Sequence, residues 1–154
     1  MNAHNPSEVD EQPQPNPPVA EPVGVAAPTA PESQIKPHPV TPVPPREAVV
    51  REVSSWKGVS VHEHRFGGVE FRLGRRELGH LHALFADLPF PRRVRDELVA
   101  SGRARPHHVL PNSGWVTALM RTAAEAGNVI GLFRQNYERA ANILSAQEEK
   151  ADEQ

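Results

Sequence analysis

The sequence contains no cysteine. It therefore forms no disulfide bonds, has no thiolate nucleophile, and leaves the redox compartment open. No apolar run is long enough to span a bilayer. The first residues also lack the basic region and apolar stretch of a secretory signal. We therefore expect a cytoplasmic protein with no membrane partner.

Motifs for nucleotide or flavin binding are missing as well. There is no G-x-G-x-x-G and no Walker loop, and the glycines of Phe66-Gly67-Gly68 and Leu73-Gly74 have the spacing of hairpin turns. Ser113 lies in Pro111-Asn112-Ser113-Gly114, which predicts a turn and not the G-x-S-x-G elbow of a hydrolase. A triad of Ser113, Asp87 and a histidine is therefore not expected.

Proline is concentrated at one end, since 13 of the 17 prolines precede Arg46. Residues 1–46 contain no aromatic residue and few large apolar ones, which predicts a disordered tail with some polyproline II character. We expect a folded domain over residues 47–145 and a polar C-terminal tail over 146–154. The domain holds 14 basic and 10 acidic residues and the tails hold 3 and 9, a charge pattern that suggests an anionic partner only weakly.

The stretch Val59–His82 has a two-residue period interrupted by glycines, which predicts an antiparallel meander of three strands. Successive strand residues point to opposite faces. The predicted core face consists of Val59, Val61, Val69, Phe71, Leu73 and Leu81. The predicted outer face consists of Ser60, His62, His64, Glu70, Arg72, Leu78, His80 and His82.

Two three-residue connections would set the register of this meander. In that register Glu70 lies between His64 and His82, and Arg72 lies in the row of His62 and His80.

The remaining segments predict three helices and two more strands. We expect helices over Glu47–Trp56, from Pro91 to Gly102, and after a capping box at Thr122–Glu125. We expect extended segments over Arg105–Leu110 and Trp115–Met120, with Trp115 in the core beside Phe71, and an apolar connection over Ala83–Phe90. The predicted order is α-β-β-β-α-β-β-α. This order predicts an α+β fold: a two-layer antiparallel sheet with helices on one face and the histidines on the other.

Histidine pairs spaced two apart on strands can converge on one ion, and a nearby carboxylate completes a set suited to zinc or iron(II). The candidate metal ligands are His62, His64, Glu70, His80 and His82. The candidate catalytic residues are His80, His82, Glu70 and His108, because an imidazole titrates near neutral pH. Two simpler interpretations stay open: a solvated sheet face, or a row of Glu–His hydrogen bonds that orders the sheet.

Two further patterns are ambiguous. In Pro106-His107-His108-Val109 only one of two adjacent strand histidines can face the same side as the others. A basic patch that could contact nucleic acid weakly is formed by Arg75, Arg76, Arg92, Arg93, Arg95, Arg103 and Arg105. A solvated helix face balanced by Asp96 and Glu97 is the competing interpretation.

Several long motifs resemble one protein family. WKGVSVHEHRFGGVEFRLGRRELGHLH, DLPFPRRVRDELVASGRARPHHVLPNSGWV and LFRQNYERA are similar to the small bacterial luciferase-domain proteins, over residues 47 to about 140. Ala83 stands where many members carry a glycine, so the backbone there is expected to differ. The chain is too short for the (β/α)₈ barrel of flavin-dependent luciferases. More distantly, the element order is similar to the MmcQ/YjbR-like fold, a likeness that says little about function.

This resemblance implies no particular activity or catalytic residue. We therefore expect a binding or interaction module that uses its histidine-rich sheet face for a small ligand or a protein. The first alternative is a metal-assisted or histidine-based enzyme that uses the same face, and the second is weak nucleic-acid binding through the arginines.

Overall fold

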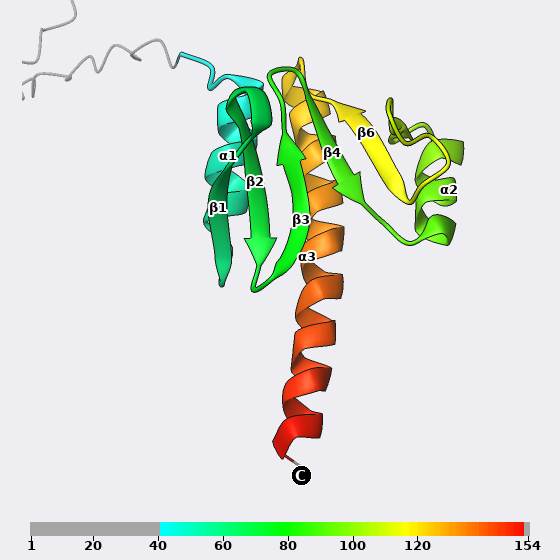
Figure 1. Cartoon of the computed structure of the whole chain (residues 1–154). Coiled ribbons are helices and arrows are strands. Elements are labelled where there is room, and N and C mark those ends of the chain that lie inside the picture. The colour runs from blue at the N-terminus through cyan, green and yellow to red at the C-terminus, as the bar shows by residue number, and fades with distance from the viewer. Residues whose placement is uncertain (1–40, 153–154) are drawn as a thin grey trace, which may run out of the picture. The chain divides into compact units, whose positions relative to one another are not determined.

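The computed structural model describes residues 41–152, so residues 1–40 of the predicted tail lie outside the described part of the chain (Figure 1). Helix α1 spans Pro45–Ser54 and begins two residues before the predicted domain boundary. Proline suits this position because the first turn of a helix leaves its N–H groups without partners.

The domain contains one six-stranded antiparallel sheet and three α-helices, which confirms the predicted α+β fold. The strands run in the order β1-β2-β3-β4-β6-β5 across the sheet. Their bounds are β1 Val59–His64, β2 Gly68–Leu73, β3 Arg76–Leu81, β4 Phe85–Pro89, β5 Arg105–Pro106 and β6 Trp115–Leu119. The other helices are α2 Arg92–Ala100 and α3 Ala123–Asp152, and a short 3₁₀ turn covers Arg65–Gly67.

Strand β4 was not predicted. The segment Ala83–Phe90, expected as a connection, contains a strand that pairs with β3 on one side and β6 on the other. Ala86 and Leu88 are fully buried and Asp87 is 1% exposed. A strand that is buried on both faces lacks the alternation of apolar and polar residues by which a strand is predicted from the sequence. The segment was therefore predicted to be an apolar connection.

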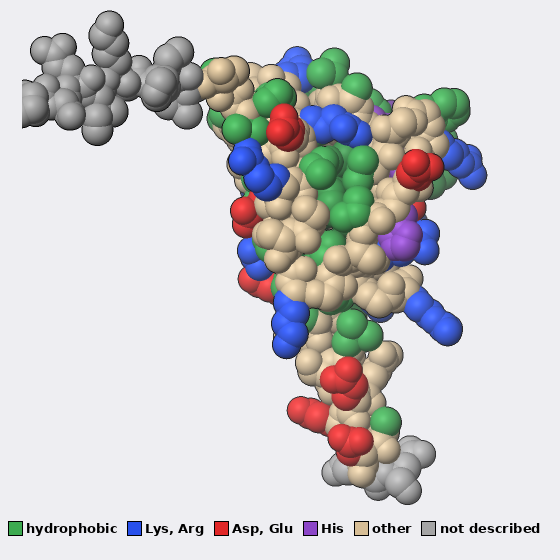
Figure 2. Space-filling view, turned by 90° about the vertical axis from the view of Figure 1, so that its left-hand side faces the viewer, with side chains coloured by type: hydrophobic (Ala, Val, Ile, Leu, Met, Phe, Trp, Pro, Cys, Tyr) green, Lys and Arg blue, Asp and Glu red, His purple; other side chains and the backbone are tan. Residues whose placement is uncertain are grey.

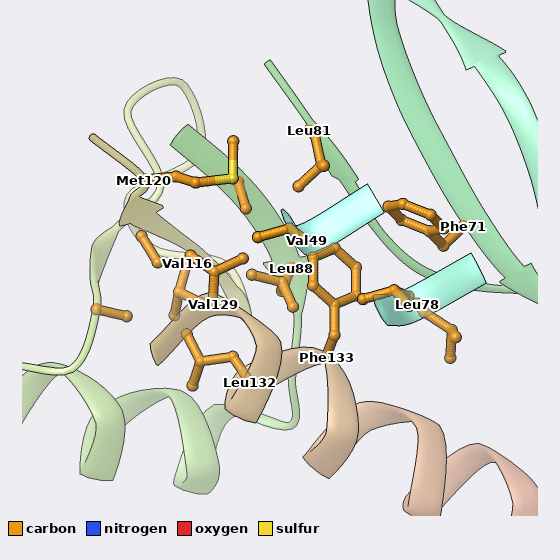
Figure 3. Close-up of a cluster of buried hydrophobic side chains, with 14 of the residues drawn as sticks. Val49, Phe71, Leu78, Leu81, Leu88, Val116, Met120, Val129, Leu132 and Phe133 are labelled. Atoms are coloured by element: carbon orange, nitrogen blue, oxygen red, sulfur yellow. The ribbon is translucent and has the colours of Figure 1, made fainter. Parts of the chain in front are cut away.

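Helices α1 and α3 cover one face of the sheet and enclose the core (Figures 1 and 3). Phe133 of α3 packs edge-on against Phe71 of β2, with ring centroids 5.3 Å apart. Asn136, one turn further along α3, donates its Nδ2 to the carbonyl oxygens of Leu78 and Pro89 at 3.0 and 2.7 Å. The long helix is thus attached to the sheet by apolar packing and by one buried amide.

Two residues lie on a different face from the one predicted. Val116 and Ala118 supply the core positions of β6, so Trp115 points to the opposite side. Leu78 is buried in the core, because a bulge between Phe71 and Arg72 shifts the phase of β3. Val61 keeps the predicted face, opposite Phe71, but is 47% exposed because it lies on the edge strand.

The register also differs by two residues from the predicted one. Glu70 pairs with His62 and His80, whereas the prediction placed it between His64 and His82. The first loop, Arg65–Gly67, begins one residue earlier than expected, and the second contains only Gly74 and Arg75. A shift of two residues moves side chains along a strand without changing their face, so the histidines keep a common side.

Ala83, at a position where a glycine is common in the similar family, has an ordinary negative φ, since Phe66 alone among the described non-glycine residues has a positive φ. Residues 146–152, expected as a polar tail, continue α3 and are exposed. Figure 2 shows acidic side chains along this projecting end of the helix. Across residues 41–152, no helix has the length and apolarity required to cross a membrane.

Candidate functional site

The sheet face opposite α1 and α3 carries the candidate site. Alternation places His64 on β1 and Asp87 on β4 on this face, and His80 and His82 come from β3 and the residue after it. The loop after β5 adds His107 and His108. These side chains line one pocket of about 360 Å³, here called the histidine pocket, together with Arg65, Phe66, Val109, Leu110 and Trp115.

The mouth of the histidine pocket is apolar. Phe66 is 99% exposed, and Val109 and Leu110 are also exposed. Phe66 adopts a left-handed conformation with φ of 58°, which is costly for a residue with a bulky side chain. Conformations of this kind persist where the surrounding structure imposes them and are often found at ligand sites.

Three imidazole rings form one wall of the pocket. The rings of His64 and His80 stack with centroids 3.8 Å apart and planes 16° from parallel. The ring of His82 stands nearly perpendicular to that of His80, with centroids 5.2 Å apart. The potential ligand nitrogens of these three residues lie within 4.8 Å of one another.

Carboxylates orient two of these rings. His64 Nδ1 lies 3.3 Å from Glu70 Oε2, and His80 Nδ1 lies 2.7 Å from Glu77 Oε1. Because a carboxylate accepts hydrogen bonds, each Nδ1 is the donor, and Nε2 is the nitrogen directed elsewhere. Glu70 also accepts from Arg72, so its negative charge is balanced within the sheet.

Asp87 lies at the centre of the pocket floor. Its Oδ2 lies 3.3 Å from His82 Nε2, 3.4 Å from His107 Nε2 and 3.6 Å from His80 Nε2. Its Oδ1 accepts a hydrogen bond from the Thr117 hydroxyl on β6. Oδ2 is buried and none of the three nitrogens is placed to form a regular hydrogen bond with it. A buried carboxylate oxygen without a regular hydrogen bond is costly, and the charge of the nearby His80 offsets part of that cost.

The tautomer of His107 follows from its backbone contacts. Its Nδ1 accepts hydrogen bonds from the N–H groups of Val109 and Leu110 at 3.2 and 3.0 Å. The neutral ring then carries its proton on Nε2, which points to Asp87. His107 therefore directs an N–H, and no lone pair, toward Asp87 Oδ2.

The environment separates the pKa values of these groups. Burial lowers the pKa of His80, but the Asp87 and Glu77 carboxylates outweigh it and raise that pKa to about 9. Burial lowers the pKa of His82, and also that of His107, although Asp87 opposes the change in both. Burial raises the pKa of Asp87, but His80 and Thr117 outweigh this effect and hold it below 3.8.

Glu70 behaves in a similar way at the edge of the pocket. Burial raises its pKa, but the hydrogen bonds from Arg72 and His64 outweigh burial and leave the pKa below 4.5. At neutral pH the site therefore contains ionised carboxylates, a protonated His80, and neutral His82 and His107.

The structure gathers only part of the predicted site. His64, Glu70, His80 and His82 lie together, as their contacts show. His62 is exposed and bonds to Ser60, and Arg72 contributes only through Glu70. Their roles as metal ligands or catalytic groups stay predictions.

Several residues of the pocket were not predicted. Asp87, Glu77, Trp115 and His107 join the cluster, and the predicted candidate His108 also lines the pocket. The expectation that only one of the adjacent histidines faces the site is wrong, because β5 ends at Pro106 and the strand rule does not apply beyond it. The sequence signal for Asp87 is a single acid inside the apolar run Leu84–Phe90.

The other two motifs form local contacts. The Ser113 hydroxyl donates to the Leu110 carbonyl and accepts from the Trp115 N–H, as expected of a turn residue. Among the patch arginines, Arg93 pairs with Glu97, Arg95 with Asp96, and Arg103 with Asn128.

Comparison with models of protein families gives a match over part of the chain. The family model described as Luciferase domain matches residues 75–136, which include β3, β4, the His107-His108 loop and the first half of α3. No curated protein matches the chain. No solved structure matches it either. Residues 75–136 are therefore similar to the Luciferase domain family, and the resemblance carried by the sequence motifs is confirmed over that stretch.

Proposed function

We propose that this domain binds a small organic molecule in the histidine pocket. The observation that supports the proposal is the combination of an apolar mouth with a polar floor in one cavity. Phe66, Val109 and Leu110 offer apolar contact at the rim, and imidazoles with a buried carboxylate supply hydrogen-bonding groups below. Ligand sites commonly have this composition, and a volume of about 360 Å³ falls within their usual range.

The strained and exposed Phe66 gives the proposal its sharpest test. An aromatic side chain 99% exposed contributes almost nothing to burial in the free protein, so its removal should not reduce stability. A ligand in the pocket would cover part of this ring. Phe66→Ala should therefore weaken ligand binding while it leaves the free energy of unfolding unchanged or slightly raised.

The experiment is a fragment screen by protein-observed NMR on the full chain. We expect hits to shift the signals of residues that line the pocket, Trp115 among them. The indole of Trp56 is an internal control, because it lies beneath Arg134 and against Tyr137, away from the pocket. Leu84→Ala is the matched control for Phe66→Ala, because Leu84 is 57% exposed and does not line the pocket.

Two results would contradict the proposal. The first is a set of hits whose shifts cluster away from the pocket. The second is a Phe66→Ala variant that binds the hits as well as wild type, or no worse than Leu84→Ala does.

The second candidate function is an enzyme that acts at the same pocket, which the position of Asp87 favours. A neutral His82 beside a buried carboxylate is arranged to accept a proton from a bound molecule, and Asp87 would stabilise the imidazolium that forms. Each hit of the screen would be incubated with wild-type and His82→Ala protein and analysed by mass spectrometry. Turnover that His82→Ala abolishes supports an enzyme, and unchanged hits support binding alone.

A further inference from the structure

We propose that His80, His82 and Asp87 form a binding site for a divalent transition-metal ion at the floor of the histidine pocket. Two histidines and one carboxylate are a donor set that zinc and iron(II) accept, with remaining positions open to other ligands. This site goes beyond the proposed binding of an organic molecule and does not depend on it.

The backbone places the three donors together. His80 is the register partner of Asp87 across β3 and β4, and His82 follows two residues later, bonded through its N–H to the Phe85 carbonyl. Neighbouring strands lie about 4.8 Å apart, so side chains on one face of paired strands reach a common point. The short loop of Ala83 and Leu84 fixes this arrangement.

The distances from Asp87 to the two histidines fit a metal ion. Asp87 Oδ2 lies 3.3 Å from His82 Nε2 and 3.6 Å from His80 Nε2. Donor atoms bound to tetrahedral zinc at 2.0–2.1 Å are about 3.4 Å from each other. The rings of His80 and His82 are 84° apart, so their in-plane lone pairs can point to one ion from different directions.

The groups behind the ligands support the same assignment. Glu77 holds the Nδ1 proton of His80, so a metal ion that displaces the other proton of this imidazolium binds at Nε2. Thr117 occupies Asp87 Oδ1, which leaves Oδ2, the buried oxygen without a regular hydrogen bond. Carboxylates behind ligand histidines are typical of metal sites, where they fix ring orientation and tautomer.

The same reasoning excludes two neighbours from the ligand set. His107 Nδ1 accepts two backbone N–H groups, so the neutral ring carries its proton on Nε2 and directs no lone pair toward Asp87. The ring of His64 is stacked on that of His80, and the lone pairs of parallel rings run side by side and do not converge. His64 therefore flanks the site.

The test is isothermal titration of untagged, chelator-treated full-length protein with Zn²⁺, and in parallel with Co²⁺, whose absorption spectrum reports its coordination. We expect one ion per chain in this site. His82→Ala should weaken binding by more than about 100-fold, because it removes a ligand, and Glu77→Gln by roughly 10–100-fold, because it removes an orienting group. His62→Ala is the matched control, since His62 shares the sheet face but bonds only to Ser60, and it should change affinity by less than about 2-fold.

Three results would overturn the site. The first is that wild type binds no ion at roughly millimolar concentration. The second is that His82→Ala and His62→Ala bind the ion with equal affinity. The third is an octahedral Co²⁺ spectrum that is identical in wild type and His82→Ala. Circular dichroism confirms that each variant is folded, and the half-exposed position of His82 makes it the safer ligand to remove. The fragment screen uses metal-free protein, so its result does not depend on whether the metal site exists, and each proposal can fail without the other.

Discussion

Asn136 should contribute far more to stability than its single amide group suggests. Pairing between β3 and β4 covers only His80 with Asp87 and Leu81 with Ala86. Beyond that point the carbonyls of Leu78 and Pro89 are no longer joined by a ladder between these strands. The Nδ2 group of Asn136, itself 7% exposed, donates to both of them.

The expected magnitude follows from the two carbonyls that would lose a donor. A buried polar group left without a partner costs about 1–3 kcal/mol. Replacement by alanine recovers roughly 0.5 kcal/mol, because alanine is a better helix former than asparagine. For two carbonyls, less the helix term, we therefore expect Asn136→Ala to lower the free energy of unfolding by about 1.5–5.5 kcal/mol.

Equilibrium urea unfolding measures this loss as a shift of the midpoint at constant m value. Asn142→Ala is the control, because Asn142 lies on the same helix and is exposed, so it should change stability by no more than about 0.5 kcal/mol. Asn136→Asp should be worse than Asn136→Ala at pH 7, because it places a carboxylate against two carbonyl oxygens. A difference of less than about 1 kcal/mol between Asn136→Ala and Asn142→Ala would refute the reasoning.

Three further predictions concern other positions. Gly79→Ala should destabilise the protein by at least about 2 kcal/mol, since Gly79 has a φ of 143° and an added Cβ would lie 2.7 Å from the Asp87 carbonyl oxygen. Gly127 lies in open space on α3, so Gly127→Ala should instead stabilise the protein by about 1 kcal/mol. Equal shifts of the melting temperature in the two variants would contradict this account. Thr122→Ala should cost about 1 kcal/mol in urea unfolding, because the Thr122 hydroxyl accepts from the Glu125 N–H at the start of α3; no loss would show that the cap is unimportant. The hydrogen bonds from Arg121 lower the pKa of Glu125 to about 2, so the stabilising effect of the Glu125 carboxylate is present above pH 4.5 and is lost as the pH falls towards 2. An NMR titration of the carboxyl group should find the pKa of Glu125 closer to 4.5 in Arg121→Ala. An unchanged pKa would contradict the pairing.

The comparison of sequence and structure shows how much periodicity can predict. The α+β class, the helices α1, α2 and α3, and the common face of His64, His80 and His82 all follow from hydrophobic patterns with periods of 3.6 and 2. These patterns survive because they are local. A register error of two residues leaves every side chain on its own face, so the histidine face was predicted although the pairs within it were not.

Only the tertiary structure decided which histidines meet and what lies between them. Asp87 was missed because β4 is covered on both faces, and a strand of that kind carries no alternation by which its polar residue could be assigned to a face. His107 was ambiguous because the end of β5 at Pro106 depends on pairing with β6, a contact distant in sequence. The sequence by itself determined the fold class and the histidine face. The carboxylate at the centre of the pocket, the tautomer of His107 and the perpendicular rings of His80 and His82 depend on how four strands and a loop come together, and no local pattern encodes that.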